Sequence, residues 1–233
     1  MSIRENLEKL NNSIEAAALK AGRTSSEIKL MAVSKTKPLE QIREAYDAGQ
    51  RLFGENRVAE AQEKFASLPE DVDLHLIGHL QRNKVKTGLS VFDCIQSLDS
   101  RELAEKLVQN YKNQIHEMKD LPIRVLLQLK TAEEGSKTGF SSEEEIIETA
   151  GWLREQQGVR IEGLMTIAPF TDDESVVREA FARCRILQEK LMSLYRDQDF
   201  SVLSMGMSSD FEWAVLEGST LLRVGSALFG GRF

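Results

Sequence analysis

The sequence predicts an eight-stranded parallel α/β barrel of the TIM type, with one extra helix before the first strand. Eight short apolar segments alternate with segments of helical period along the chain, and none has the spacing of a Greek key. A β–α unit repeated eight times closes naturally into a barrel. An open doubly wound sheet is the alternative, but the glycine-rich turn that normally follows its first strand is missing.

The first third of the chain predicts a helix, then two strands that are each followed by a helix. Residues 2–21 carry apolar side chains at helical spacing, and Gly22 ends that helix. Residues 29–34 are mostly apolar or small, which predicts a strand buried on both faces. Pro38 opens the next helix and Gly49 ends it. A brief strand and a turn follow at 51–56, and a further helix at 56–66. We expect the N-terminal helix to cover the bottom of the barrel.

The middle of the chain repeats the strand–helix alternation. Apolar runs and helical spacing predict a strand, a short helix and a second strand at 74–78, 79–86 and 91–95. Asp99 or Ser100 is placed to cap a helix that runs to about Tyr111. Residues 123–129 form the most clearly apolar strand of the chain, with Pro122 before it.

The last third contains three strands, and a helix precedes each of them. Ser141 and Glu144 have the spacing of a capping box for a helix that reaches Leu153. Thr171 and Glu174 have the same spacing before a long helix that reaches about Tyr195. The strands are predicted at 159–167, 201–205 and 220–224, and the remaining helix at 209–217.

Composition limits the classes of function. The 233 residues show no linker or composition break, which predicts a single domain over residues 1–233. A net charge of −7 argues against non-specific nucleic-acid binding. No apolar run approaches a membrane span and the N-terminus does not look like a signal peptide, so we expect a cytoplasmic protein. Cys94 and Cys184 are far apart in sequence and predict no disulfide framework, and the three histidines predict no metal site.

Lys35 stands at the end of the first predicted strand, where α/β proteins place their ligands. A lysine that emerges from an apolar strand can be desolvated, which lowers the pKa of its amine and makes it a nucleophile toward aldehydes. Taken alone, the strand favours a solvated lysine, because lysines are mostly exposed. The residues that share its end of the barrel change that balance.

In a barrel, the residues that follow the strands converge on one mouth. Each residue is a weak signal alone, and their convergence is the argument. They are Lys35, Asn56, His79, Ser97, Lys130, Met165 or Thr166, Ser208, Ser209, Arg223, Gly225 and Ser226.

The last two loops carry the strongest signal for an anion site. Ser208 and Ser209 follow one strand, and Gly225 and Ser226 follow the next. Free backbone N–H groups, small residues and serine hydroxyls are suited to a phosphate group, which barrels often bind after strands seven and eight. Each loop alone fits a plain tight turn equally well. Arg223 lies within an apolar strand without a nearby carboxylate in sequence, so a ligand atom or a distant acidic residue must accept its hydrogen bonds.

An imine-forming amine, an arginine and a phosphate cradle in one mouth suit pyridoxal phosphate. The combined motifs resemble the pyridoxal-phosphate homeostasis proteins, which are similar to the N-terminal barrel domain of alanine racemase without its second domain. The resemblance extends from about Ser2 to Arg232. The matching segments are 32–36, 53–56, 75–84, 163–166, 204–210, 223–226 and 229–230.

The resemblance implies pyridoxal 5'-phosphate as the cofactor and gives each mouth residue a role. Lys35 would hold it covalently as an aldimine, Asn56 would lie near the ring and Arg223 near the pyridine nitrogen. The phosphate would be held by Ser208, Ser209, Gly225 and Ser226, and the pocket would also be lined by His79 and Met165. Lys137 is either a second cofactor-handling lysine or, more simply, a solvated loop residue.

The sequence favours a binding protein over an enzyme. An arginine stays protonated, so it keeps the pyridine nitrogen unprotonated and makes the ring a weaker electron sink. Racemisation also needs an acid or base on each face, and the three tyrosines, Tyr46, Tyr111 and Tyr195, fall inside predicted helices. We therefore expect a monomeric protein without catalytic residues that maintains the cellular supply of pyridoxal phosphate and passes it to apo-enzymes. The alternatives are a minimal amino-acid racemase and, further behind, a Schiff-base aldolase for a sugar phosphate.

Overall fold

The predicted barrel is present in the structure, a computed structural model that describes residues 2–114, 122–131 and 138–230. Within these residues, parallel strands pair in sequence order around a closed barrel, and β1 pairs with both β2 and β8. The fold class predicted from the sequence is therefore confirmed. The strands are β1 Lys29–Val33, β2 Leu52–Glu55, β3 Asp73–Leu76, β4 Cys94–Leu98, β5 Ile123–Leu129, β6 Val159–Thr166, β7 Val202–Ser204 and β8 Leu221–Val224.

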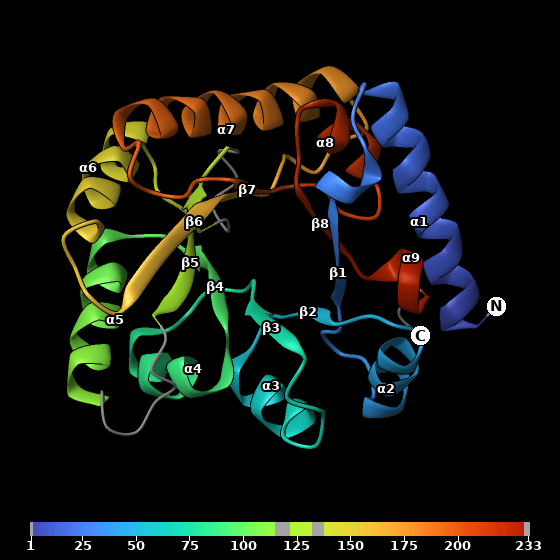
Figure 1. The fold of residues 1–233 in the computed structure, drawn as a ribbon, viewed down its shortest axis with the longest axis horizontal. Coiled ribbons are helices and arrows are strands. Elements are labelled where there is room, and N and C mark those ends of the chain that lie inside the picture. The colour runs from blue at the N-terminus through green and yellow to red at the C-terminus, as the bar shows by residue number, and fades with distance from the viewer. Residues whose placement is uncertain (1, 115–121, 132–137, 231–233) are drawn as a thin grey trace.

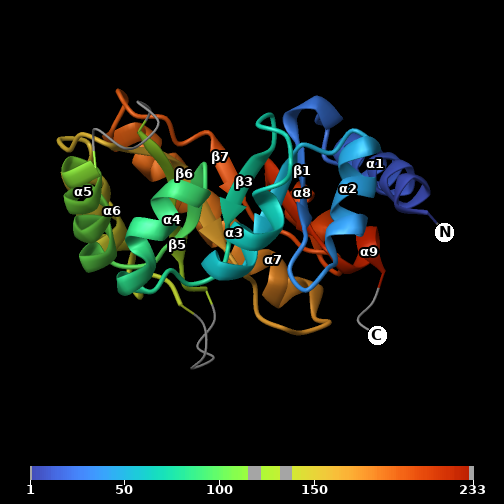
Figure 2. The ribbon, with the colours of Figure 1, turned by 90° about the horizontal axis from the view of Figure 1, so that it is seen from below.

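Helices surround the barrel on its outside (Figure 1), and the view turned by 90° shows them flanking the strands (Figure 2). The α-helices are α1 Ile3–Lys20, α2 Leu39–Asp47, α3 Val58–Phe65, α4 Val85–Val91, α5 Arg101–Gln114, α6 Glu143–Leu153, α7 Glu174–Leu194, α8 Phe211–Leu216 and α9 Ser226–Phe229. Two short 3₁₀ helices, η1 Ser25–Glu27 and η2 Arg82–Lys84, complete the described elements. None of the helices in the described part of the chain combines the length and apolar character needed to cross a membrane.

The position of α1 differs from the prediction. It does not lie under the barrel but packs in the outer ring against α2, α8 and α9 (Figure 1). The helix after β8 has only four residues, so it cannot cover the barrel between β8 and β1. The apolar stripe of α1, which includes Ile3, Leu7 and Ile14, covers that gap. Asn6 fixes the contact by donating to the carbonyl of Leu228 at 2.9 Å.

The fourth β–α unit begins later than predicted. Residues up to Val91 continue α4, and β4 spans Cys94–Leu98 rather than 91–95. Val85 and Leu89 lie one helical turn apart and are both buried, which explains why the helix continues past Lys86. Gly88 is also buried there, against Leu80, where there is little room for a larger side chain.

Two predicted helix caps lie at a different residue. The hydroxyl of Ser142, not that of Ser141, accepts the hydrogen bond from the backbone N–H of Glu145 at 3.2 Å. Asp173, rather than Thr171, caps α7 through its carboxylate. In each case a neighbouring residue with the same capping ability begins the helix closer to its apolar stripe. Ser100, one of the two candidates for α5, accepts from the N–H of Leu103 at 3.3 Å.

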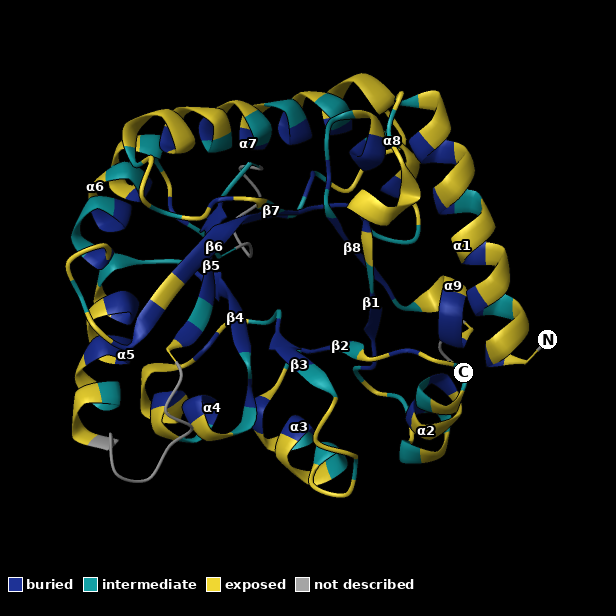
Figure 3. Cartoon of the chain, viewed as in Figure 1, coloured by how far each residue is buried: buried dark blue, intermediate teal, exposed yellow. Residues whose placement is uncertain are grey.

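The core has two parts. The larger one lies between the barrel wall and the helices, and Figure 3 shows the buried faces of the helices turned toward the strands. The smaller cluster contains Cys94, Leu126 and Met165 from β4, β5 and β6. Gln96, two residues after Cys94, bonds to Ser204 of β7. Since β4 and β7 are not neighbours in the sheet, that bond crosses the barrel interior. Residues on this face of β4 therefore point inward.

Candidate functional site

A cavity of about 520 Å³ opens at the carboxyl ends of the strands. Its walls come from the loops after β1, β2, β3, β6 and β7 and from β8 with the segment that follows it. Seven of the nine residues predicted for the site line it: Lys35, Asn56, Ser208, Ser209, Arg223, Gly225 and Ser226. The mouth predicted from strand counting thus brings most of the candidate residues together.

Lys35 lies in a tight turn between β1 and α2. The N–H of Lys37 donates to the carbonyl of Ser34 at 3.0 Å, which closes the turn. Thr36 has a left-handed backbone conformation, with φ of 64°, that a β-branched residue adopts only under constraint. Its N–H donates to Oε1 of Glu60 on α3 at 2.6 Å. These contacts hold the backbone on both sides of Lys35 in one conformation.

A buried acidic residue supports this turn from behind. Glu55, at the end of β2, is fully buried and pairs with Lys64 of α3 at 3.4 Å. Burial raises the pKa of the Glu55 carboxyl above its ordinary value, although the hydrogen bond from Ser34 and the charge of Lys64 act in the opposite direction. Lys64 also donates to the carbonyl of Ser34 at 3.1 Å. The Lys35 turn is therefore attached to α3 through charged groups that do not line the cavity.

Asn56 is positioned by a close backbone approach. A Cβ added to Gly78 would stand 2.3 Å from the carbonyl oxygen of Asn56 and 2.8 Å from its Cα. Only glycine fits at position 78 while the loops after β2 and β3 remain this close. The approach holds Asn56 at the cavity wall.

Arg223 of β8 is almost completely buried, with an exposed fraction of 4%. Its Nη1 donates to the carbonyl oxygen and to the hydroxyl of Ser204, both at 2.7 Å, and its Nη2 donates to the carbonyl of Thr166 at 2.8 Å. Burial lowers the pKa of Arg223 to about 10, so the guanidinium remains charged at neutral pH. These acceptors are all uncharged, so the positive charge is not neutralised by an ion pair among the described residues.

The loops after β7 and β8 form the opposite wall. Ser208 is linked to the loop after β8, because its Oγ accepts from the N–H of Ala227 at 3.4 Å. Asp210 accepts from the N–H of Met207 and holds the turn that carries Ser208 and Ser209. Hydroxyl groups and loop backbone from both strands therefore face one space, as expected for the predicted anion site.

The charged side chains that line the cavity are all positive. Three cationic side chains, Lys35, Lys37 and Arg223, line it, and no Asp or Glu is found among the described residues of its wall. The whole chain carries a net charge of −7. A wall with this composition favours an anionic ligand over a cationic or neutral one.

Two predicted residues do not line the cavity. His79 lies outside it and pairs through Nδ1 with Asp99 at 2.7 Å. Met165 is fully buried in the interior cluster with Cys94 and Leu126. Met165 lies near the end of β6, as predicted, but its side chain points into the packed interior rather than into the mouth. Lys137 lies outside the described residues.

Two further residues, Lys37 and Phe170, line the cavity. Lys37 lines it and donates from Nζ to the carbonyl of Gly230 at 2.9 Å. Phe170, in the loop after β6, is 92% exposed at its rim. The signal for Lys37 was its position two residues after Lys35 in the same turn. Phe170 follows the proline that ends the sixth predicted strand, which is also a rim position.

Both cysteines are free and buried. Burial raises the pKa of Cys184 to about 12 and raises that of Cys94 well above its ordinary value. Such thiols remain protonated and unreactive at neutral pH. In the described part of the chain, no three His, Cys, Asp or Glu side chains are grouped as a metal site requires.

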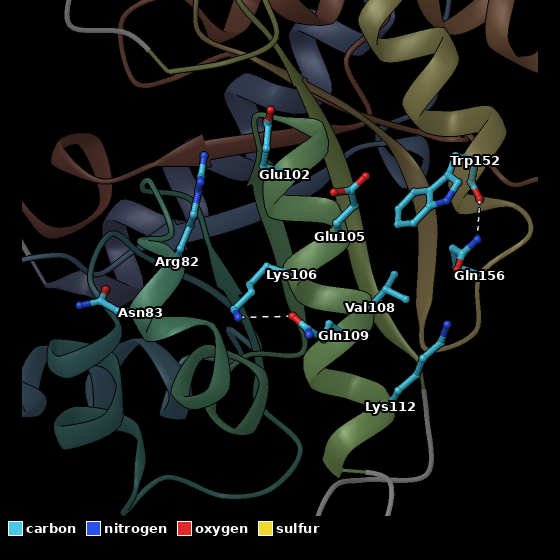
Figure 4. Close-up of a pocket in the computed structure, with 10 residues that line it drawn as sticks. All are labelled: Arg82, Asn83, Glu102, Glu105, Lys106, Val108, Gln109, Lys112, Trp152 and Gln156. Atoms are coloured by element: carbon cyan, nitrogen blue, oxygen red, sulfur yellow. Dashed lines mark hydrogen bonds between the residues drawn. The ribbon is translucent and has the colours of Figure 1, made fainter.

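A larger groove, of about 760 Å³, lies outside the barrel (Figure 4). Its wall comes mainly from α5, with Arg82 and Trp152 at its sides (Figure 4). It mixes acidic and basic side chains, such as Glu102 and Lys106, and contains none of the strand-end residues. The groove therefore lacks the convergence of cations and hydroxyls that marks the cavity in the barrel mouth.

Comparison with known proteins agrees with the geometry. Residues 3–233 match the family described as "Alanine racemase, N-terminal domain". The chain is 38% identical to the pyridoxal phosphate homeostasis protein of Pasteurella multocida, over 100% of this chain and 98% of that protein. It is 38% identical to the homologue of the same name in Escherichia coli K12, over 99% and 97% of the two chains.

Solved structures give the same result. PipY of Synechococcus elongatus without PLP superposes with a TM-score of 0.88 at 37% identity, covering 98% of this chain and 100% of that one. PipY with PLP bound gives a TM-score of 0.83 at 36% identity, with the same coverage. Alanine racemase of Clostridium difficile shares the fold, with a TM-score of 0.77 at 16% identity over 99% of this chain and 56% of that one.

The match to the family covers nearly the whole chain, and the curated relatives align with it from end to end. The chain belongs to the alanine racemase N-terminal domain family and, within it, to the pyridoxal phosphate homeostasis proteins.

Proposed function

We propose that this protein binds pyridoxal 5'-phosphate in the barrel mouth and takes part in the homeostasis of that cofactor. The observation that carries the proposal is the cavity wall, where a lysine amine, a buried arginine without a carboxylate partner and serine hydroxyls face one space. The donor set fits the cofactor, which offers an aldehyde, a pyridine nitrogen and a dianionic phosphate. The relatives named pyridoxal phosphate homeostasis proteins and the PLP-bound structure of PipY support the same assignment.

We assign each part of the cofactor to particular residues of the cavity wall. Nζ of Lys35 is the amine that we assign to the aldehyde, joined as a Schiff base with loss of one water. We assign Arg223 to the ring nitrogen and Asn56 to the side of the ring, because both residues line the cavity. The phosphate is assigned to the loops after β7 and β8, through Ser208, Ser209, Gly225 and Ser226. His79 and Met165 have no direct contact in this assignment, because neither lines the cavity.

The other residues of the cavity wall favour a role in homeostasis of the cofactor over catalytic turnover of a substrate. Arg223 remains protonated, so in this assignment it would donate to the ring nitrogen and keep a proton off that nitrogen, which would weaken the ring as an electron sink. Tyr46 donates to Asp71 and Tyr195 to the carbonyl of Ile147, both outside the cavity. Tyr111 packs against Gly158. No tyrosine therefore stands in the described wall as a second acid or base for racemisation.

The proposal includes the finer points expected from the sequence. We assign the whole site to a single domain over residues 1–233, and we assign the protein to a monomer. We place the protein in the cytoplasm, where apo-enzymes that need the cofactor are its partners. Light scattering of the purified protein tests the monomer, and a dimer that shares the cavity would contradict it.

The proposal is tested by spectroscopy and peptide mapping. The purified protein is expected to be yellow, and borohydride is expected to remove the visible band and attach the cofactor to the peptide that contains Lys35. The Lys35→Ala variant should lose both properties. Retention of the same band and attachment in the variant would refute the assignment of Lys35, and a wild-type protein that fails to bind added cofactor would refute the function.

The second candidate function is a minimal amino-acid racemase. It is favoured only by the fold shared with alanine racemase, which at 16% identity extends to architecture and not to activity. Incubation of the loaded protein with a panel of L- and D-amino acids separates the two. Racemisation at a substantial rate would contradict the proposed binding role.

A further inference from the structure

A line of hydrogen bonds crosses the barrel interior from Arg223 to Asp73 at the opposite end. Nη1 of Arg223 donates to the hydroxyl of Ser204 at 2.7 Å, and that hydroxyl donates to Oε1 of Gln96 at 2.7 Å. Nε2 of Gln96 contacts Nδ1 of His75 at 2.8 Å. Nε2 of His75 contacts Oδ1 of Asp73 at 3.0 Å. The line connects the cavity wall to the first residue of β3, at the amino end of the barrel.

The ends of the line fix the direction of every bond in it. A guanidinium can only donate and an ionised carboxylate can only accept. Ser204 accepts from Arg223 and must therefore donate to Gln96. The amide nitrogen of Gln96 then donates to Nδ1 of His75, which leaves the ring proton on Nε2, facing Asp73. Each group has one hydrogen-bonding orientation.

The Asp73 end of the line is held by ion pairs. Arg124 of β5 pairs with Asp73 and stands 3.7 Å from Glu162 of β6. Burial by itself raises the pKa of the Asp73 carboxyl, but the hydrogen bond from His75 and the pairing with Arg124 lower it well below its ordinary value. Asp73 is therefore an acceptor throughout the neutral range. The 3.0 Å approach of His75 to this carboxylate is shorter than its 3.4 Å contact with Arg124, which agrees with a proton on Nε2.

The middle of the line is completely enclosed. Ser204 and Gln96 have no exposed surface and His75 is 4% exposed. A polar group in such a place is costly when it loses its partner, so Gln96 cannot turn without consequence. An exchange of its amide nitrogen and oxygen would put an acceptor against Nδ1 of His75 and require a doubly protonated ring. It would also leave the hydroxyl of Ser204 without an acceptor.

We propose that Gln96 is a positioning residue for Arg223. It holds the hydroxyl of Ser204 as an acceptor and thereby fixes the plane of the guanidinium, and the neutral ring of His75 fixes Gln96 in turn. With both Nη1 hydrogens directed at Ser204 and one Nη2 hydrogen at Thr166, the Nε–H and the remaining Nη2 hydrogen are left for the cavity. This inference rests on the proposed function only in its statement that the cavity side of Arg223 faces the cofactor.

The test compares three variants of the whole protein. Gln96→Leu removes both hydrogen bonds, and Gln96→Glu keeps an acceptor for Ser204 but requires a proton on Nδ1 of His75. Gln50→Leu is the matched control, because Gln50 is a buried glutamine whose Nε2 donates to the carbonyls of Leu30 and Leu52, away from the line. The first readout uses cofactor-free protein, in which ¹⁵N NMR reports the Nε–H of Arg223 and the ring nitrogens of His75.

The expected results separate positioning from general destabilisation. Gln96→Leu should broaden or shift the Arg223 Nε–H signal and release pyridoxal phosphate about tenfold faster, because the hydroxyl of Ser204 is no longer held as an acceptor for the charged Arg223. Gln96→Glu should restore both values toward wild type, because the glutamate keeps an acceptor for the hydroxyl of Ser204. Gln50→Leu should change neither value.

Several results would overturn the inference. An unchanged Arg223 signal in Gln96→Leu would do so, and so would equal release rates in Gln96→Leu and Gln50→Leu. If Gln96→Leu does not fold, Ser204→Ala replaces it, because this change removes the hydroxyl and keeps the carbonyl acceptor of Arg223. A wild-type protein that binds no cofactor would refute the proposed function alone, because the NMR comparison does not use the cofactor.

Discussion

The hydroxyl of Ser34 donates to Oε1 of Glu55 at 2.7 Å, one residue before the lysine that we assign to the cofactor. The other carboxylate oxygen of Glu55 is buried and has no hydrogen-bond partner among the described residues. The turn that carries Lys35 is therefore attached to a carboxylate that is incompletely satisfied. A buried charge with this environment makes the stability of the turn depend on pH.

Glu55→Gln is expected to change how stability depends on pH. Burial raises the pKa of Glu55 in the folded protein above its unfolded value. The wild type therefore has its full contribution from this group below the unfolded pKa, near 4.5, and loses it as the pH rises through the folded pKa. The free energy of unfolding of the wild type relative to the variant should fall over that interval and stay level above it.

Urea denaturation from pH 3 to pH 8 measures this difference. Glu60→Gln is the control, because the free energy of unfolding should depend on pH in the opposite direction through this residue. Burial alone raises the pKa of Glu60, but the hydrogen bonds from Lys64 and Thr36 lower it overall, so its contribution is lost as the pH falls below about 4.5. The same pH slope in both variants would contradict the environment described for Glu55.

Thr36→Gly is expected to separate strain from function. Glycine adopts the left-handed conformation of Thr36 without cost, which offsets its greater freedom in the unfolded chain. The free energy of unfolding should change by less than about 1 kcal/mol. Release of pyridoxal phosphate should become faster, because the turn that holds Lys35 loses rigidity. Thr36→Asn, which tolerates this backbone conformation, should retain the slow release, and equal rates in the two variants would count against the turn as a constraint.

Gly78→Ala is expected to displace Asn56. The added methyl group would overlap backbone atoms of Asn56 rather than a flexible side-chain end, so the loops after β2 and β3 must separate. Overpacking of this kind costs about 1–3 kcal/mol of stability and should weaken cofactor binding. Gly22→Ala, at a left-handed glycine with no atom within 4 Å, is the control. It should lower stability by about 1 kcal/mol and leave binding unchanged.

Arg223→Met is expected to weaken cofactor binding by at least about tenfold, since it removes a charged donor from an enclosed wall. Covalent attachment at Lys35 should persist, because the amine is unchanged. Absorbance titration measures the affinity, and peptide mapping after borohydride reduction locates the attachment. Binding as tight as in the wild type would show that Arg223 does not contact the cofactor.

The barrel could be predicted because its signal is periodic and repeated. Each strand and each helix leaves its own pattern of apolar residues, so a local error in one unit does not change the count. The fourth β–α unit shows what such a pattern cannot determine: the strand was predicted at 91–95, but β4 spans Cys94–Leu98. Val91 is the last residue of α4, whose buried residues include Val85 and Leu89, and an apolar residue at such a boundary fits a strand equally well.

The candidate site could be predicted where a charged or hydroxyl side chain lies at the end of a strand. Lys35 and Arg223 were assigned to the mouth because a charged residue directly after an apolar strand, or within one, is unusual. The assignment of Met165 to the cavity wall failed because the side-chain direction at a strand end depends on strand length and on a bulge between β5 and β6. Gln96 could not be recognised at all, because an uncharged polar residue in a strand has no distinctive pattern. Its importance depends on contacts with Ser204 and His75, which are distant in sequence.

The pairing of β1 with β8 has a consequence for the newly made chain. Met31 and Arg223 are partners in the register, so the lysine and the arginine of the site come from nearly opposite ends of the sequence. A ribosome delivers Lys35 long before Arg223. The two walls of the mouth that carry Lys35 and Arg223 are therefore brought together only after β8 has been made and has paired with β1.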